Sequence, residues 1–105
     1  MEQRRTRRFK LQLPLSITRS GSERLTLSGF TKNISSSGVL FDTEREPDLD
    51  RPIEYIITLN HEGGAPVNIR CIGKVVRAQR NDDPHADLAY QIAATLERYE
   101  FVRDQ

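Results

Sequence analysis

The 105-residue sequence has no tryptophan, only one cysteine, and no apolar run as long as a membrane span. A helix that crosses a bilayer needs about 20 consecutive apolar residues, so the sequence predicts no membrane insertion. The arginine-rich start also lacks the apolar stretch of a secretory signal, and we therefore expect a cytoplasmic protein. The single cysteine, Cys71, excludes an internal disulfide and any zinc site built on cysteine pairs. Its alternating surroundings, VNIRCIGKVV, predict a buried strand thiol.

Residues suited to catalysis or metal binding are also scarce. His61 and His85 lie in predicted turns, and neither stands at metal-ligand spacing from another histidine or from cysteine. Asp82 and Asp83 come just before a proline, which is a composition typical of turns. We therefore expect no enzymatic activity, no metal site and no cofactor.

Positive charge is concentrated at the N-terminus. The net charge is +1, but residues 1–10 hold five basic residues and one acidic residue, so the rest of the chain carries −3. A domain that binds long nucleic acid usually carries a broad basic face and a high net positive charge. We therefore expect no long nucleic acid as a partner, and a small anion suits the local charge better.

Hydrophobic alternation predicts an all-β domain. Apolar residues recur with period two in six segments, which are separated by turns rich in glycine, proline, serine and asparagine. Because no long helical pattern separates these segments, antiparallel pairing and closure into a six-stranded barrel are expected. The six predicted strands lie within residues 11–17, 24–34, 39–41, 53–59, 67–79 and 87–96.

The last segment departs from this period. Thr95 can cap a helix, and Leu96, Tyr99 and Val102 recur near helical spacing. The pattern predicts a short C-terminal helix that lies across the barrel mouth. With a chain of this length, residues 1–105 are expected to form a single domain, in which residues 1–10 are a flexible arginine-rich segment.

Two short motifs stand out from this background. The stretch RRTRRF contains one arginine pair at RxxxR spacing, Arg4 and Arg8. The stretch NISSSG places Asn33, Ser35 and Gly38 where the strand pattern breaks, in the form NxSxxG. Each motif alone also suits a solvated basic tail or a serine turn between strands. Their combination in an all-β chain is more specific than either motif.

In these motifs the chain resembles the PilZ domain family, bacterial receptors for the second messenger cyclic di-GMP. RRTRRFKLQLPLSI is similar to the family's arginine motif and first strand, TKNISSSGVLF to its second motif and the next strand, and GKVVRA to its long fifth strand. The family's closing YxxGxxF pattern is present only in weakened form, as Tyr90, Ala93 and Leu96. The resemblance implies a non-enzymatic β-barrel that binds cyclic di-GMP and signals to a protein partner.

The resemblance also implies that Arg4 and Arg8 grip phosphate and guanine. Arginine suits both tasks, because its planar fork forms paired hydrogen bonds with phosphate oxygens or with guanine O6 and N7. In an extended chain, residues four apart are separated by about 13 Å, a reach that fits a ligand with two phosphates and two bases. Arg5 and Arg7 either add a phosphate contact or only raise the local potential that speeds ligand capture.

On the barrel side, the resemblance implies that Asn33 and Ser35 contact a guanine. Asn33 offers a donor and an acceptor toward a base edge, and Ser35 offers a rotatable hydroxyl. Gly38 permits either a positive φ or a close backbone approach.

The sequence also allows two other functions. One is a ligand-independent protein-interaction barrel, against which the intact motifs argue. The other is a small RNA- or single-strand-binding barrel, which would need exposed aromatic residues among basic ones, whereas most aromatics here lie in alternations that look internal. The sequence also leaves open the protein partner, the oligomeric state, and whether one or two ligand molecules bind. In the family that stoichiometry is associated with the residue before RxxxR, which is Gln3 here.

Overall fold

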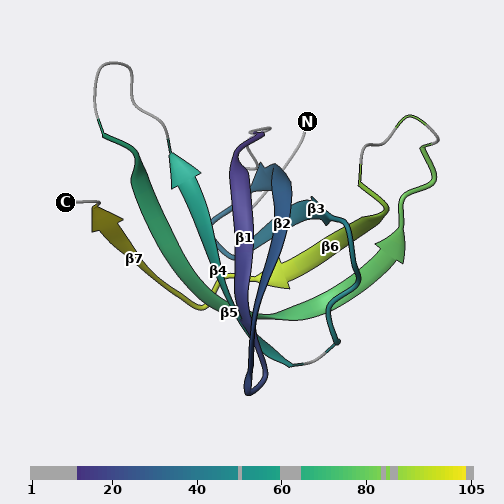
Figure 1. Cartoon of the computed structure of the whole chain (residues 1–105), viewed down its shortest axis with the longest axis horizontal. Coiled ribbons are helices and arrows are strands. Elements are labelled where there is room, and N and C mark those ends of the chain that lie inside the picture. The colour runs from purple at the N-terminus through teal and green to yellow at the C-terminus, as the bar shows by residue number, and fades with distance from the viewer. Residues whose placement is uncertain (1–11, 50, 60–64, 84, 86–87, 104–105) are drawn as a thin grey trace, which may run out of the picture.

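The computed structural model describes residues 12–49, 51–59, 65–83, 85 and 88–103, and the regular structure in these ranges consists of strands alone (Figure 1). These ranges contain no helix long and apolar enough to cross a membrane. The seven strands are β1 (Pro14–Ser20), β2 (Glu23–Ile34), β3 (Gly38–Thr43), β4 (Pro52–Leu59), β5 (Val67–Arg80), β6 (Tyr90–Thr95) and β7 (Arg98–Arg103).

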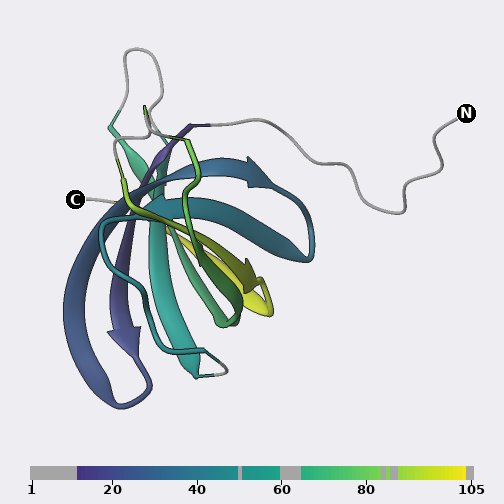
Figure 2. The ribbon, with the colours of Figure 1, turned by 90° about the vertical axis from the view of Figure 1, so that its right-hand side faces the viewer.

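Six of the strands form a closed antiparallel barrel. The hydrogen-bonded order is β4, β1, β2, β3, β6 and β5, and pairing between β4 and β5 closes the ring. Figure 2 shows the strands curving around a common interior. The predicted six-stranded barrel is therefore confirmed.

Side-chain alternation along the strands builds the core of this barrel. In β4, for example, Ile53, Tyr55 and Ile57 are buried, while Glu54 and Ile56 between them are partly exposed. The ring of Tyr55 packs against that of Phe41, with 5.9 Å between centroids. The other buried apolar residues are Leu15, Ile17, Leu27, Val39, Cys71, Val75, Ile92 and Ala94.

Cys71 lies in this core, as its alternating surroundings predicted. Its side chain is fully buried, and its Sγ donates a weak hydrogen bond to the carbonyl oxygen of Ile69 at 3.7 Å. Burial raises the pKa of the Cys71 thiol to about 12, because a thiolate would lose its solvation there. The thiol is therefore protonated and poorly nucleophilic at neutral pH.

β5 is the longest strand and changes partners along its length. Up to Lys74 it pairs with β4, and from Val75 onward it pairs with β6. Gly73 lies just before this change, and a Cβ added there would stand 1.8 Å from the carbonyl oxygen of Thr95. The backbones of β5 and β6 approach too closely here for any side chain, and this close approach requires glycine at position 73.

The predicted C-terminal helix is not present, because Arg98–Arg103 forms strand β7 along the first half of β5. Thr95 does not cap a helix. Its hydroxyl accepts a hydrogen bond from the backbone N–H of Lys74 and donates one to the carboxylate of Glu97. The sequence RYEFVR is rich in residues that favour strands, and the edge of β5 offers backbone partners for all six residues. Pairing with this edge outweighs the weak helical spacing.

The expectation that most aromatic residues are internal is wrong for β7 and for Phe30 on β2. Phe41 and Tyr55 are buried, but Phe30, Tyr99 and Phe101 are exposed.

Candidate functional site

The NxSxxG motif spans the end of β2, the turn that joins β2 to β3, and the start of β3. Asn33 is close to the end of β2, Ser35 begins the turn, and Gly38 is the first residue of β3. Figure 2 shows this turn projecting beyond the barrel wall, at the end of the blue strands. The register of β2 against β3 shifts between Thr31 and Asn33, which marks a bulge just before the motif.

The hydroxyl of Ser35 organises this turn. It accepts hydrogen bonds from the backbone N–H groups of Ser37 at 3.3 Å and Gly38 at 3.2 Å, and it donates to the carbonyl oxygen of Gly38 at 3.2 Å. The backbone N–H of Ser35 donates to the same carbonyl at 2.9 Å. NxSxxG therefore forms a serine turn in this structure, and Ser35 also lines an open hollow.

Of the two properties that glycine offers at position 38, a positive φ and room for a close backbone approach, the structure uses the second. The backbone of Gly38 is not in the positive-φ region, which Gly21 alone occupies among the described glycines. A Cβ at position 38 would lie 3.0 Å from the carbonyl oxygen of Ala94 on β6. Close packing of β3 on β6, and not an unusual backbone conformation, is therefore what favours glycine here.

Asn33, Ser35 and Gly38 share one open hollow with residues of β5 and β6. The hollow has a volume of about 220 Å³, and no described residue that lines it is acidic. Its size is below the roughly 300–1,000 Å³ of a pocket that encloses a drug-sized ligand. It can therefore cover only part of a dinucleotide. The other lining residues are Ser37, Val39, Leu40, Val76, Arg77, Ala93, Ala94 and Thr95.

Arg77 is the residue of this hollow that the motifs did not reveal. The register of β5 against β6 shifts between Val75 and Arg77, so Val76 is an extra, exposed residue in the strand. A bulge of this kind re-aims the side chains that follow it. The exposed side chain of Arg77 contributes the only cationic group among the described lining residues. Two adjacent valines before an arginine, which break the alternation of β5, are the signal that could have identified it.

The remaining predicted site residues, Arg4, Arg5 and Arg8, lie outside the described residues. The described chain begins beside β2, close to the motif. The backbone N–H of Leu13 donates to the Thr31 hydroxyl at 2.9 Å, and the Leu13 carbonyl accepts from the Thr31 N–H at 2.9 Å. Thr31 precedes Asn33 by two residues on β2, so the chain leaves the N-terminal segment beside the motif.

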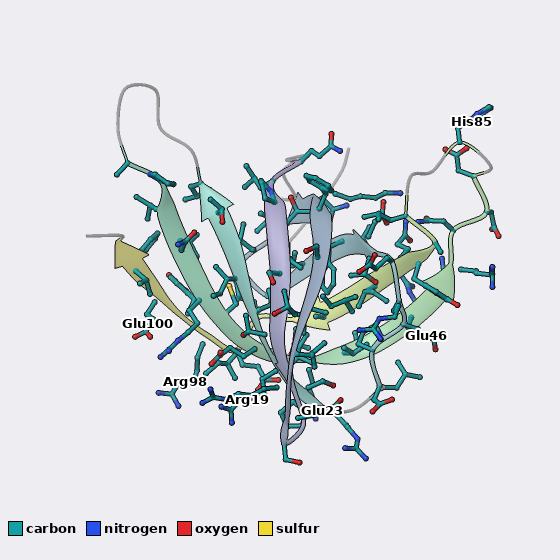
Figure 3. All side chains as sticks on the ribbon, viewed as in Figure 1. Arg19, Glu23, Glu46, His85, Arg98 and Glu100 are labelled. Atoms are coloured by element: carbon teal, nitrogen blue, oxygen red, sulfur yellow. The ribbon has the colours of Figure 1, made fainter. Side chains whose placement is uncertain are left out.

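The histidine and aspartate positions are consistent with turn chemistry. His85 is exposed on the loop between β5 and β6 (Figure 3), and its backbone N–H donates to the carboxylate of Asp83 at 2.9 Å. His61 lies outside the described residues. Across the described chain, no three histidine, cysteine, aspartate or glutamate side chains gather as metal ligands would.

Comparison with known proteins adds one finding to this geometry. No curated protein and no solved structure matches the chain significantly. A family model for the PilZ domain matches residues 2–101, nearly the whole chain, and so covers both motifs and the barrel. The chain therefore belongs to the PilZ domain family, the family of cyclic di-GMP receptors.

Proposed function

We propose that this protein is a non-enzymatic receptor that binds cyclic di-GMP in the hollow beside the β2–β3 turn, with Arg4 and Arg8 completing the site. The observation that carries the proposal is that Asn33, Ser35 and Gly38 line one hollow together with a cationic residue from β5. Membership of the PilZ family supplies the class of ligand.

Chain geometry supports the participation of the arginines. Leu13 is held against Thr31, two residues from Asn33. Arg8 precedes Leu13 by five residues, and five residues span at most about 17 Å. Arg8 is therefore tethered within reach of the hollow, and Arg4 can extend across a ligand that the hollow covers only in part.

Each residue type matches a part of this ligand. The guanidinium groups of Arg4 and Arg8 bind phosphate oxygens and the guanine edge, and Asn33 reads a second edge from the barrel. Ser35 holds the turn in shape and offers its hydroxyl to the ligand. Arg5 adds a further phosphate contact or general positive potential.

Ligand binding would then act as a signal. Closure of the N-terminal segment over the hollow changes the surface beside β2 and β3, and a protein effector recognises that changed surface. We therefore propose a protein effector as the partner. Capture experiments with and without cyclic di-GMP would identify it.

Isothermal titration calorimetry with cyclic di-GMP tests the binding site. We expect saturable heat for the natural chain, and no comparable heat with cyclic di-AMP, which lacks guanine O6. Arg8→Ala and Ser35→Ala should each weaken binding by about tenfold or more, since each removes a hydrogen bond to a charged or buried group. Arg24→Ala, which removes an exposed arginine from the far end of β2, serves as the matched control.

Two calorimetric outcomes would contradict different parts of the proposal. If the natural chain gives no heat with cyclic di-GMP at micromolar protein, the receptor function is wrong. Retained affinity in both Arg8→Ala and Ser35→Ala would instead leave the function in place and move the site elsewhere.

A further inference from the structure

β7 is an edge strand with an unusual surface. It pairs with β5 along one side, and no other described strand pairs with it along the other. Edge strands present unpaired backbone groups that can be extended by another strand. No residue of β7 lines the hollow beside the β2–β3 turn.

The inner face of β7 carries two uncovered aromatic residues, Tyr99 and Phe101. Tyr99 pairs with Cys71 of β5 and Phe101 with Ile69, and residues opposite each other in a sheet share one face. Tyr99 and Phe101 thus extend the face of β5 that forms the barrel core. Even so, they are 61% and 64% exposed. Their rings pack edge to face, with centroids 6.1 Å apart.

The outer face of β7 carries opposite charges two residues apart. Glu100 forms an ion pair with Arg70 of β5. Arg98 is exposed and has no ion-pair partner among the described residues. Figure 3 shows the labelled side chains of Arg98 and Glu100 projecting away from the barrel.

This charge order is complementary to itself. When a strand pairs antiparallel with its own copy about Tyr99, Arg98 of each copy lies opposite Glu100 of the other. The two Tyr99 side chains then face each other, and each Phe101 lies diagonal to the opposite Tyr99, within reach of an aromatic ring. A two-fold homodimer requires a strand whose charges are complementary to those of its own copy, and β7 meets this requirement. Binding to a partner of unrelated sequence would not require it.

We propose that the protein forms a symmetric homodimer by antiparallel pairing of two β7 strands, with Tyr99 at the two-fold axis. Each Glu100 then binds Arg70 of its own chain and Arg98 of the other. A contact made mainly by two six-residue strands is smaller than a standard protein interface, so the dimer belongs to the weak class. The two barrels would join their sheets edge to edge, and each ligand hollow would stay on its own barrel.

Sedimentation velocity over a concentration series tests this dimer. The natural chain should associate reversibly as its concentration rises. Arg98→Glu and Glu100→Arg should each weaken self-association by roughly tenfold or more, because each places like charges opposite each other twice. An equimolar mixture of the two variants should associate again, since every acidic side chain of one variant then lies opposite a basic side chain of the other.

Arg24→Glu makes the same charge change on β2 and should leave self-association unaltered. Circular dichroism establishes that each variant retains its strands. A natural chain that stays monomeric up to its highest soluble concentration would overturn the proposal. So would single variants that still dimerise, or a mixture of folded variants that fails to associate.

Discussion

At the scale of single residues, Ser35 and Arg77 reach the candidate site in two different ways. Ser35 belongs to a motif that is visible in the sequence, and its hydroxyl forms hydrogen bonds with Ser37 and Gly38 within the turn. Arg77 belongs to neither RxxxR nor NxSxxG, and a bulge on β5 brings it to the same hollow. Ser35, which shapes the β2–β3 turn, and Arg77, which lies on β5, thus line the same hollow.

Arg77 is expected to contribute affinity for cyclic di-GMP. Arg77→Ala should weaken binding by about tenfold, since a hydrogen bond to a charged group is worth roughly 1.5–3 kcal/mol. Arg77→Lys should lose less, because it keeps the charge but not the planar fork. Calorimetric titration of both variants measures this, with Arg24→Ala as the comparison. Equal affinity in Arg77→Ala and the natural chain would remove Arg77 from the site.

At the scale of elements, the end of β6 joins several parts of the barrel. The hydroxyl of the buried Tyr55 donates to the Thr95 carbonyl at 3.0 Å, and the Lys74 N–H donates to the Thr95 hydroxyl at 2.9 Å. The N–H of Leu96 donates to the carbonyl of Ser37 in the β2–β3 turn at 2.9 Å. Thr95 itself lines the hollow. The closeness of β5 and β6 at Gly73 therefore bears on both stability and the site.

Gly73→Ala should destabilise the barrel by roughly 2 kcal/mol or more, because the new methyl group would overlap the Thr95 carbonyl and displace the acceptor of the Tyr55 hydroxyl. Urea unfolding followed by circular dichroism measures the loss. Gly38→Ala is the matched control: its methyl group would lie 3.0 Å from the Ala94 carbonyl, and a shift of a few tenths of an ångström relieves that contact. A smaller loss in Gly73→Ala than in Gly38→Ala would contradict this account of β5.

The C-terminal segment also belongs to the scale of elements. Three residues at helical spacing favoured a helix, but a segment of this length has too few turns to be stable by propensity alone. The open edge of β5 supplied backbone partners, and the segment became β7. Whether the edge of β5 is free to pair depends on the tertiary structure. A local sequence pattern therefore could not predict this pairing.

At the scale of the whole molecule, the core contains two ionisable groups held in their neutral forms. Burial raises the pKa of Cys71 to about 12 from an ordinary value of 9.0, and burial, followed by the charge of Cys71 and Glu97, raises the pKa of Tyr55 far above its ordinary value. Both groups lose a proton more easily in the unfolded chain than in the folded barrel. Stability that is fully present below pH 9 should therefore be lost as pH rises from 9 toward 12.

The expected slope is about 1.4 kcal/mol per pH unit for each proton that only the unfolded chain releases. Chemical unfolding at a series of pH values from 8 to 11 measures it. Cys71→Ala should be less stable at pH 8 because it leaves a cavity, but its stability should fall less steeply above pH 9. An unchanged slope in Cys71→Ala would show that the thiol does not contribute.

By itself, the sequence determined which side of most strands faces inward. Alternation places successive side chains on opposite faces, so Ile53, Tyr55 and Ile57 had to share one face, and the run around Cys71 had to bury its thiol. The NxSxxG turn was likewise visible, because serine and glycine act on the backbone beside them. These are local effects, carried by neighbours in the chain.

The tertiary structure decided which residues from distant strands lie next to these locally determined strands and turns. Pairing of β3 with β6, and of β6 with β5, brought Arg77 to the hollow that Asn33 also lines. The same closure left one edge of β5 open for β7 and exposed Tyr99 and Phe101. Such outcomes depend on which strand edges meet when the sheet closes, and that is settled by packing of the whole core and not by the residues nearest in sequence.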